Sequence, residues 1–594
     1  MLEDTRTSKG PETLVYDMCG ITSYCGDRKA SEVIEVSLKR LDYRGYDSVG
    51  VAVSSESGLD VRKGIGGIDE IDEELGLGNM EGGVGIGHTR WATHGKVSEE
   101  NAHPHISCDG RFAIVHNGII ENWDNLKEEL DGCSFRSGTD SEVIAHYIER
   151  KARESGVEDA VREFMAEAEG SFAVVLLDSE KDMLFAFKKG SPLALGIGEE
   201  EVFVGSDAYA FCTYTDKAIF LCDHEYAVLK NGEYVLRDAE GRTLERKIKR
   251  INYDYTQDVD SRSDHYMYKE IMEIPEAIER LDGSLKLEQK HRLEEFQNKL
   301  KNKDRVVLTG SGTSYHAALL GIYFLQEVGV EAHATVASEF KNYGRIDENT
   351  VLVPISQSGE TKDVLEAIDY CRKMGAEIAS ITNVPHSTVE RKSDANIRIR
   401  AGQEICVAAT KTFTNQLYLL MKLAEGLGGT KLGKNISDTI RRLLDSNEEK
   451  IKDLAVEIEG KKDIYIIGKG ETYPVAMEIA LKLKEISYIH AEGMMGGELK
   501  HGTLALVEEG TPVISLIPNG SSEIVSNVRE VEARKGNTIK ISPSCGRFNI
   551  PETGTKGFVF LSTVLGFLLT YWIASNKGLP IDKPRNLAKC VTTK

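Results

Sequence analysis

Two hydrophobic patterns divide the chain. From residue 19 to about residue 236, short runs of β-branched, aromatic and aliphatic residues alternate with glycine turns and a few helical stretches. Residues 112–115, 172–177 and 202–204 are such runs, each bounded by turn-forming or charged residues. The pattern predicts an α+β domain over residues 19–236.

The rest of the chain has a different periodicity. From about residue 268 onward, helical stretches alternate with short aliphatic strands, which is typical of parallel sheets with crossover helices. The run VVLTGSGTSY at residues 306–315 recurs as IYIIGKGETY at residues 464–473, in each case a strand, a GxG turn and a helix start. We predict two tandem three-layer α/β domains with parallel sheets. The expected boundaries are 237–267 for a linker, 268–430 and 431–575 for the two domains, and 576–594 for a carboxyl-terminal tail.

The longest apolar stretch, at residues 558–574, is interrupted by hydroxyl-bearing residues and a glycine. It is a little shorter than the roughly 20 residues needed to cross a bilayer, so we expect a buried helix and no membrane span. The formal net charge of -22 argues against nucleic acid and anionic membranes as partners, since both would be repelled.

The ten cysteines are scattered, with no CxxC pair, as expected for a reducing compartment. The residues before Met18 are polar and of mixed charge, so they do not resemble a secretory signal. We therefore expect a cytoplasmic protein.

Cys19 directly follows Met18 and precedes Gly20. If the chain began at Cys19, its free α-amino group would lie beside its thiol, giving a nucleophile and a base on one residue. We therefore expect residues 1–18 to be absent from the mature protein, through cleavage of a leader or a start at Met18. A buried structural thiol is the alternative interpretation.

The downstream loops carry the chemistry that glutamine requires. They read YRGYDS at residues 43–48, HTRWATHG at 88–95, HNG at 116–118 and GTDSE at 138–142. Arg90 can bind an α-carboxylate and Asp140 an α-ammonium group. The Asn117 side chain and the Gly118 backbone N–H can stabilise the oxyanion that forms when a thiolate attacks an amide.

These motifs resemble the class II, or N-terminal nucleophile, glutaminase domain. The resemblance implies a four-layer αββα fold, Cys19 as nucleophile with its amine as base, and Asn117 and Gly118 as the oxyanion hole. Trp91 is implied as a gate over the ammonia path, and Arg44 as a loop-ordering residue. The implied glutamine-binding residues are Arg90, Trp91, Thr93, His94, Gly118 and Asp140.

The histidines of this block raise the alternative of a metal site. They are His88, His94, His103, His105 and His116. No carboxylate-rich or cysteine-rich ligand set accompanies them at a metal-binding spacing, so structural hydrogen bonding is favoured. We expect no metal and no cofactor.

A phosphate cradle is predicted in the first α/β domain. The aliphatic strand at residues 351–355 leads into SQSGET at residues 356–361, and an apolar-periodic helix follows. Hydroxyl groups and backbone N–H groups at a helix start suit a phosphate, although an ordinary capping turn is the alternative. The nearby GxG turn lacks the third glycine of a dinucleotide fingerprint, so Thr313 and Ser314 are expected to contact a sugar phosphate instead.

The second copy of the repeat has no counterpart of SQSGET and is expected to supply chemistry. Its candidates are Lys482, Glu485 and His501. Lys482 and Glu485 are spaced i, i+3 and so share one helix face, as catalytic groups or as a surface salt bridge.

These motifs resemble tandem sugar-isomerase (SIS) domains, and with the glutaminase block they resemble the glutamine–fructose-6-phosphate aminotransferase family. The resemblance implies that Lys589 forms a Schiff base with the open-chain ketose, His501 assists ring opening and Glu485 moves a proton between C1 and C2. L-Glutamine and D-fructose 6-phosphate are the implied substrates, and a homodimer the implied assembly. The implied sugar-phosphate contacts are Thr313, Ser314, Ser356, Gln357, Ser358, Thr361 and Lys482.

The chain departs from this family's pattern at Ala409, where serine is frequent, and at Thr503, where proline is usual. Two other functions are considered. SIS domains also occur in sugar-phosphate-binding regulators, but Glu485, His501 and Lys589 together argue for catalysis. A glutaminase serving another acceptor is disfavoured by the SIS repeat and by the lack of a GxxxxGK[ST] nucleotide loop.

Overall fold

The computed structural model describes residues 19–91, 96–130, 132–251, 265–342, 345–433, 435–519 and 521–589. These residues form two compact units, one up to residue 251 and the other over residues 265–589. The predicted leader at 1–18, the glutamine-binding candidates Thr93 and His94, and part of the predicted linker lie outside the described residues.

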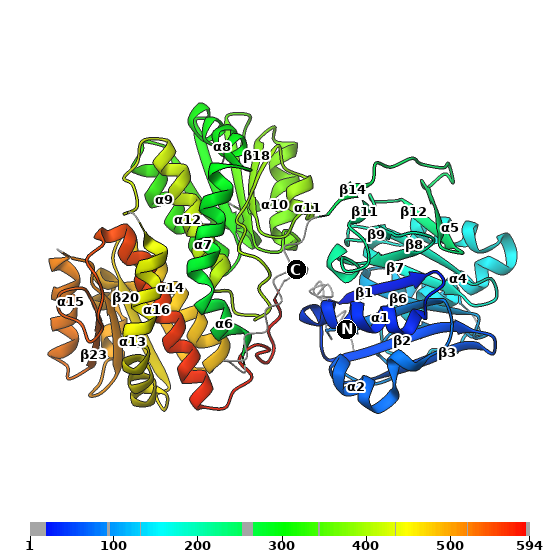
Figure 1. The fold of residues 1–594 in the computed structure, drawn as a ribbon, viewed down its shortest axis with the longest axis horizontal. Coiled ribbons are helices and arrows are strands. Elements are labelled where there is room, and N and C mark those ends of the chain that lie inside the picture. Colours follow the sequence, from blue (N-terminus) through cyan, green and yellow to red (C-terminus); the bar gives the residue numbers. More distant parts are fainter. Residues whose placement is uncertain are drawn as a thin grey trace, which may run out of the picture. The chain divides into compact units, whose positions relative to one another are not determined.

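The amino-terminal unit contains two antiparallel sheets (Figure 1). The eight-stranded sheet has the order β14-β11-β9-β10-β1-β4-β2-β3 and the six-stranded sheet the order β13-β12-β8-β7-β6-β5. The strands are β1 (Gly20–Cys25), β2 (Ser48–Ser55), β3 (Gly58–Ile65), β4 (Val84–Arg90), β5 (His105–Ile106), β6 (Phe112–Ile120), β7 (Gly170–Asp178), β8 (Met183–Lys189), β9 (Ala194–Ile197), β10 (Val202–Gly205), β11 (Lys217–Phe220), β12 (Tyr226–Lys230), β13 (Glu233–Arg237) and β14 (Lys249–Arg250).

Helices cover the outer face of each sheet. The helices of this unit are α1 (Ala30–Leu41), α2 (Ile68–Leu75), α3 (Trp123–Glu128), α4 (Glu142–Ser155) and α5 (Val157–Glu167). Residues of α1 and α2 share a hydrophobic cluster with the eight-stranded sheet, and residues of α4 and α5 share another with the six-stranded sheet. A third cluster lies between the two sheets, which gives the order helix, sheet, sheet, helix. The predicted αββα fold is confirmed.

Strand β6 shows how the sequence produces these layers. Phe112 and Ile114 belong to the cluster under α4 and α5, whereas Ala113 and Val115 belong to the cluster between the sheets. Successive side chains of a strand point to opposite faces, and both faces are buried here. An uninterrupted apolar run is therefore required, and residues 112–115 supply it.

The carboxyl-terminal unit contains two parallel sheets, of five strands in the order β16-β15-β17-β18-β19 and four strands in the order β21-β20-β22-β23. In both sheets the strand before the GxG turn, β15 or β20, lies between the next two strands of its copy. The repeat read from the sequence is therefore a repeat of topology. The strands are β15 (Arg305–Gly310), β16 (Ala332–Val336), β17 (Thr350–Ser356), β18 (Glu377–Thr382), β19 (Ala395–Arg398), β20 (Asp463–Gly468), β21 (His490–Met495), β22 (Pro512–Leu516) and β23 (Asn537–Ile541).

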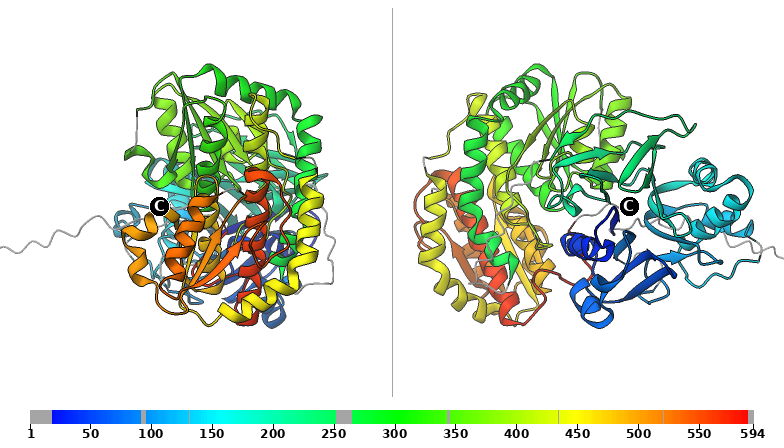
Figure 2. Two further views of the ribbon diagram at one scale, coloured as in Figure 1. Left: turned by 90° about the vertical axis from the view of Figure 1, so that its left-hand side faces the viewer. Right: turned by 45° about the vertical axis from the view of Figure 1, so that its right-hand side comes forward.

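Helices link the two copies of the repeat. Helix α9 follows the first GxG turn, α14 follows the second, and the two helices pack on each other. In both views of Figure 2, α16 in red lies beside α13 in yellow, with which it makes extensive contact. The helices of this unit are α6 (Tyr266–Met272), α7 (Ile274–Lys286), α8 (Lys290–Asn302), α9 (Thr313–Gln326), α10 (Lys362–Lys373), α11 (Thr388–Arg391), α12 (Lys411–Gly426), α13 (Ile436–Ile458), α14 (Thr472–Lys482), α15 (Ser522–Glu532) and α16 (Gly554–Asn576).

Helix α16 is long and apolar enough to cross a membrane by length and composition, but 94% of its most apolar window is buried in the fold. The hydroxyl groups of Ser562, Thr563 and Thr570 donate to backbone carbonyls four residues earlier, at 2.7–2.8 Å. Their polarity is thereby satisfied inside the helix. The expected buried helix at residues 558–574 is confirmed.

Candidate active sites

Cys19 lies at the start of β1 and is fully buried. Its thiol is 3.4 Å from the backbone N of Trp91, which donates to the sulfur, and 3.7 Å from the carbonyl oxygen of Trp91. Its own carbonyl oxygen accepts hydrogen bonds from Asn117 Nδ2 at 2.8 Å and Arg44 Nε at 3.1 Å. Residues far apart in the sequence thus fix the main chain of Cys19 and place its sulfur at the end of β4.

Asn117 is held in one orientation by a buried histidine. His88 Nε2 lies 3.1 Å from Asn117 Oδ1 and 3.0 Å from the carbonyl oxygen of His116. Both partners are acceptors, so His88 Nε2 carries the hydrogen and donates it. Asn117 therefore directs its amide nitrogen toward Cys19. Sequence reasoning had treated His88 only as a structural residue and missed this positioning contact.

Gly118 follows Asn117 on β6 and has φ of 119°, in the region that favours glycine. A Cβ atom at this position would lie 2.0 Å from the carbonyl oxygen of Ser171 on β7. Any other residue would force β6 away from β7 and displace Asn117 from the thiol.

Two further glutamine-binding candidates are buried in the same unit. Arg90 is the last residue of β4, next to Trp91. Asp140 Oδ2 accepts a hydrogen bond of 2.8 Å from the backbone N of Ile120, which anchors the GTDSE turn to the end of β6. The ring of Trp91 makes an edge contact with Tyr46, at a centroid distance of 5.1 Å.

The GTDSE turn is also fixed by Glu142, a residue without a predicted role. Its carboxylate accepts hydrogen bonds from the backbone N of Arg136 and from the backbone N and hydroxyl of Ser137, at 2.7–3.1 Å. Burial alone would raise the pKa of Glu142, but the hydrogen bond from His146 and these donors lower it to about 2. An ionised side chain therefore holds the turn that carries Asp140.

Four histidines form a buried cluster behind this site. The rings of His88 and His103 are 4.1 Å apart, and those of His103 and His105 are 4.5 Å apart. Burial lowers the pKa of His88 and of His116 to about 3, and it lowers the pKa of His103 and of His105 well below the usual range. All four are neutral at pH 7 and serve as hydrogen-bonding and packing groups.

The SQSGET segment forms a closed turn after β17. Ser356 Oγ accepts a hydrogen bond from the backbone N of Gly359 at 3.0 Å and lies 3.2 Å from Thr361 Oγ1. Ser358 Oγ accepts from the backbone N of Glu360 at 3.2 Å, and the carbonyl oxygen of Gln357 accepts from the backbone N of Asn383. Gly359 has φ of 67°, and a Cβ there would meet the Ser387 hydroxyl at 2.0 Å. The turn leads into α10, so its hydroxyl groups gather at a helix amino terminus.

The first GxG turn lies at the same edge of the sheet. Strands β15 and β17 are parallel neighbours, so their carboxyl ends meet. Ser314, at the start of α9, accepts a hydrogen bond of 3.1 Å from Gln416 Nε2 of α12. The two turns proposed to hold a sugar phosphate are therefore adjacent.

Lys482 lies at the centre of a buried ionic group that joins the two repeats. Its side chain is fully buried, and Nζ lies 2.6 Å from Glu485 Oε2, 3.3 Å from Glu478 Oε1 and 3.1 Å from Thr313 Oγ1. His316 of α9 lies 2.7 Å from the other oxygen of Glu478. Burial would lower the pKa of Lys482, but Glu478 and Glu485 raise it above its ordinary value. Lys482 is therefore a permanent cation.

Glu485 occupies a turn of π-helix, Leu483–Ser487 (η5), that follows α14. Burial raises the pKa of Glu485 above its ordinary value, against the opposing effects of Lys482 and Lys589. Glu485 Oε2 lies 2.6 Å from Lys482 Nζ. An acid with a raised pKa beside a buried ammonium group is suited to proton transfer near neutral pH.

Lys589 lies in the carboxyl-terminal tail, and two contacts fix its amine. Its Nζ donates to Glu404 Oε2 at 2.5 Å and to the carbonyl oxygen of Cys406 at 2.7 Å. Glu404 also accepts from the backbone N of Thr410 and the hydroxyl of Thr412. The tail is fixed further by Arg585, whose backbone N donates to the Tyr488 hydroxyl at 2.9 Å. Tyr488 follows η5, so the tail contacts both the loop that carries Glu404 and the end of the helical turn that carries Glu485.

A second acid lies behind the Lys589 site. Glu270 of α6 accepts from the backbone N of Ile405 and of Cys406 through Oε1, while its buried Oε2 has no hydrogen-bond partner among the described residues. Burial and the charge of Glu404 raise the pKa of Glu270 to about 8. Because Oε1 accepts both N–H groups, the proton of the neutral acid belongs on Oε2.

His501 stands apart from this group. It ends the 3-10 segment Gly496–His501 (η6), is exposed, and makes no hydrogen bond or ion pair within the part of the chain that the structure describes. The structure thus pairs Lys482 with Glu485 and ties the Lys589 tail to Tyr488, close to Glu485 in sequence, but shows no such link for His501 among the described residues.

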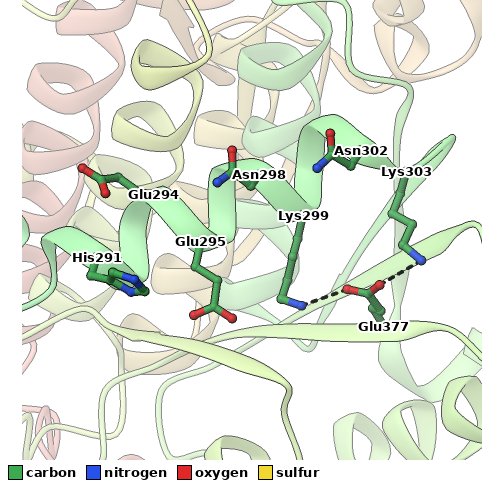
Figure 3. A pocket seen from close by; sticks show the side chains of 8 residues that line it. All are labelled: His291, Glu294, Glu295, Asn298, Lys299, Asn302, Lys303 and Glu377. Atoms are coloured by element: carbon green, nitrogen blue, oxygen red, sulfur yellow. Dashed lines mark hydrogen bonds and ion pairs between the residues drawn. The ribbon is translucent and has the colours of Figure 1, made fainter.

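A surface hollow on the first repeat is a poor phosphate site. It is lined by residues of α8 and by Glu377 of β18 (Figure 3). Its cations, Lys299 and Lys303, both lie 2.9 Å from the Glu377 carboxylate, which neutralises part of their charge. The SQSGET turn remains the better candidate.

Comparison with known proteins identifies the family of the chain. Residues 88–213 match a glutamine amidotransferase domain, and residues 299–426 and 457–545 match the SIS domain. The glutamine–fructose-6-phosphate aminotransferase (isomerizing) of Thermococcus kodakarensis is 43% identical over 97% of this chain and all of that protein. That of Pyrococcus horikoshii is 42% identical over the same shares. The chain belongs to the glutamine–fructose-6-phosphate aminotransferase (isomerizing) family.

A solved carboxyl-terminal domain of glucosamine–fructose-6-phosphate aminotransferase from Francisella tularensis is 32% identical, with a TM-score of 0.48. It covers 54% of this chain and 99% of that chain. We call the described residues 19–251 the glutaminase unit and the described residues 265–589 the SIS unit.

Several acids of the SIS unit were missed from the sequence. Glu478 could have been found, because it precedes Lys482 by four residues on one helix. Glu404 gave no local signal, since its partner Lys589 lies 185 residues away. Glu270 and His316 likewise acquire their partners only through the fold.

The histidine cluster predicts acid sensitivity of the glutaminase unit. Unfolded histidines bind protons below about pH 6.5, whereas these folded ones stay neutral, so stability is full above pH 6.5 and falls as the pH drops. Between pH 6.5 and 5 the free energy of unfolding should fall by up to about 2 kcal/mol per histidine. Tryptophan fluorescence of a Trp572→Phe variant reports on this unit, because the other two tryptophans, Trp91 and Trp123, both lie in it.

His103→Phe should reduce that pH dependence in the same Trp572→Phe background. The matched control is His224→Asn, an exposed histidine of the same unit, which should leave it unchanged. A free energy of unfolding that stays flat between pH 6.5 and 5 would contradict the prediction.

The raised pKa of Glu270 predicts that the SIS unit loses stability as the pH rises, the opposite of the glutaminase unit. The folded state retains a proton that the unfolded chain loses near pH 4.5, so the free energy of unfolding falls as the pH rises from about 4.5 to about 8. The expected slope from this residue is about 1.4 kcal/mol per pH unit. Glu270→Gln keeps the acceptor for Ile405 and Cys406 but cannot ionise, so it should remove this pH dependence of the free energy of unfolding, measured by urea unfolding.

Glu276→Gln, on the exposed face of α7, is the control and should keep the pH dependence. Equal slopes in the two variants would refute the raised pKa of Glu270.

Proposed function

We propose that the chain converts D-fructose 6-phosphate and L-glutamine into D-glucosamine 6-phosphate and L-glutamate, the first step of hexosamine synthesis toward UDP-N-acetylglucosamine. The observation that carries the proposal is the anchoring of the Lys589 amine on Glu404, with the tail tied through Arg585 to Tyr488 just after the Glu485 turn. The same chain holds a buried Cys19 whose main chain is bound by Asn117. An amine for the sugar carbonyl, a carboxyl group for proton transfer and a thiol for the amide are the groups this reaction requires.

In the glutaminase unit, Cys19 attacks the carboxamide of glutamine and its free α-amine accepts the thiol proton. Asn117 and the backbone N–H of Gly118 stabilise the oxyanion. Arg90 binds the α-carboxylate and Asp140 the α-ammonium group. Ammonia leaves, and water releases glutamate from the thioester.

The remaining assignments in this unit follow the family resemblance. Thr93 and His94 complete the glutamine site, and Trp91 gates the ammonia path. Arg44, which binds the Cys19 carbonyl oxygen, orders the adjacent loop.

In the SIS unit, the phosphate is bound at the two neighbouring turns. The proposed contacts are Thr313, Ser314, Ser356, Gln357, Ser358 and Thr361. Lys482, a buried cation next to Thr313, adds positive potential to this region. His501 assists opening of the sugar ring.

Lys589 forms a Schiff base at C2 of the open-chain ketose. The amine must first lose a proton, and Glu404 at 2.5 Å is the acceptor at hand. Ammonia then attacks C2 and releases the lysine, and Glu485 moves a proton from C1 to C2 to give the aldose. Hydrolysis of glutamine consumes one water and imine formation releases one, so the overall reaction balances.

The alternatives are weaker. A regulatory sugar-phosphate sensor does not need a lysine whose amine is fixed by a buried carboxylate and a main-chain carbonyl. A glutaminase serving another acceptor leaves the tandem SIS repeat without a role. We further propose a cytoplasmic homodimer, and light scattering of the purified chain would check its mass.

The division of labour predicts separable activities. Cys19→Ala should reduce glutamine-dependent formation of glucosamine 6-phosphate by at least about 10³-fold, because the nucleophile is lost. The same variant should still interconvert fructose 6-phosphate and glucose 6-phosphate, since Glu485 and Lys589 are intact. Coupled enzyme assays measure both rates.

Glu485→Gln is the reciprocal variant. It should lose isomerisation and amino-sugar formation while retaining hydrolysis of glutamine. Loss of both half-reactions in Cys19→Ala, or sugar binding without any amino-sugar product in the native chain, would overturn the proposal.

The amino terminus gives a further prediction. A free α-amine at Cys19 is required as the base, so the chain with residues 1–18 attached should be inactive as a glutaminase. A chain expressed from Met18, with the methionine removed, should be active. Mass spectrometry of the amino-terminal peptide identifies each form, and equal glutaminase activity of the two forms would refute the role of the amine.

A further inference from the structure

Three soft ligands meet on the glutaminase unit, away from the Cys19 thiol contacts. Cys108 lies in the loop between β5 and β6, Cys133 in the loop after α3, and His146 on α4. The two sulfur atoms and a histidine nitrogen lie within 4.8 Å of one another. The three residues are distant in sequence, so no spacing motif marked them, and the expectation of no metal was based on the histidines at residues 88–116.

The spacing of Cys108 and His146 suits a tetrahedral zinc ion. Cys108 Sγ and His146 Nδ1 are 3.4 Å apart. With Zn–S of about 2.3 Å and Zn–N of about 2.0–2.1 Å, the S–N edge of a tetrahedral site is about 3.6 Å. The pair therefore needs only a small displacement to bind one ion.

The histidine is also oriented as a zinc ligand. While Nδ1 faces Cys108, the other ring nitrogen, Nε2, lies 3.4 Å from Glu142 Oε1. Both side chains are almost completely buried. A carboxylate on the remote nitrogen fixes the ring and its tautomer, which is the outer arrangement that zinc-binding histidines usually have.

The protein also leaves access to the site. Cys108 is exposed and Cys133 is partly exposed, so solvent can supply a fourth ligand. The backbone N of Cys108 donates to Glu149 Oε2 of α4 at 2.7 Å, so the Cys108 loop is fixed on the helix that carries His146. The guanidinium group of Arg153 pairs with Asp109, the next residue along this loop.

We propose that Cys108, Cys133 and His146 form a zinc site with one position open to water. Two thiolates and a neutral imidazole make the bound divalent ion electrically neutral, and this ligand set favours zinc over hard cations. The ion joins the Cys108 loop, the Cys133 loop and α4.

The site has a consequence for glutamine binding, which rests on the proposed function. Glu142 contacts His146 on one side and holds Arg136 and Ser137 on the other. The turn that follows carries Asp140. Zinc therefore stabilises the segment between Cys133 and Asp140 and should lower the KM for glutamine more than it changes kcat.

The test uses the full chain in its reduced state under anaerobic conditions. Zinc is titrated in the Cys19→Ala background, to remove the nucleophilic thiol, against a chromophoric chelator, and cobalt is titrated separately for its thiolate charge-transfer absorption. We expect one ion per chain and a cobalt spectrum typical of tetrahedral thiolate coordination. Cys108→Ser, at an exposed position, should weaken zinc binding by at least about 100-fold, and Glu142→Gln by about 10–100-fold.

Cys222→Ser is the matched control, because Cys222 is also an exposed cysteine of this unit. It should leave zinc affinity unchanged. Absence of zinc uptake by the reduced chain, or equal affinity in Cys108→Ser and Cys222→Ser, would overturn the site. The glutamine KM is measured separately, in the chain that begins at native Cys19, with and without zinc. Zinc uptake without a change in that KM would overturn only the link to Asp140, and a chain without glutaminase activity would still give the zinc stoichiometry.

Discussion

The buried charge of Lys482 is the constraint on which the architecture of the SIS unit depends. A fully buried ammonium group is tolerable only when paired, because an isolated ion in a low-dielectric interior is very costly. Glu478 and Glu485 supply the countercharge, and Thr313 and His316 bring α9 of the first repeat to the same group. The sheet edge that carries Ser314 and Ser356 is thereby set next to the helix that carries the acid. Removing one partner of such a group typically costs about 3–5 kcal/mol.

The carboxyl-terminal tail solves a second placement problem. A loop lysine has many conformations, and catalysis requires one. Glu404 and the Cys406 carbonyl fix the amine, and the Tyr488 hydroxyl fixes the main chain at Arg585. The guanidinium of Arg585 also lies 4.3 Å from the centre of the Tyr488 ring. The tail is therefore anchored at two points, Arg585 and Lys589.

Features that depend on local sequence patterns could be predicted from the sequence. Runs such as residues 112–115 disclosed the strands, and the duplicated GxG turns disclosed the repeat, because sheet and crossover periodicities are local. Lys482 and Glu485 were found as a pair because one helix holds them. Glu404, Glu270 and the link from His88 to Asn117 were not found, because their partners are created by the tertiary fold. The zinc ligands Cys108, Cys133 and His146 escaped notice for the same reason.

The two sites handle charge in opposite ways. Around Cys19 the contacts to the main chain come from Asn117 and Arg44, and the histidines behind them are kept neutral by burial. An oxyanion at Cys19 would thus be met by fixed dipoles that need no rearrangement. Around Lys589 the charges are present but compensated in pairs, so that a proton can pass between an amine and a carboxylate without creating an isolated buried ion. The raised pKa of Glu270 favours its neutral form and so keeps a second negative charge away from Glu404. If Glu270 were ionised, Lys589 would face two carboxylates, which would favour its ammonium form and oppose the neutral amine that a Schiff base requires.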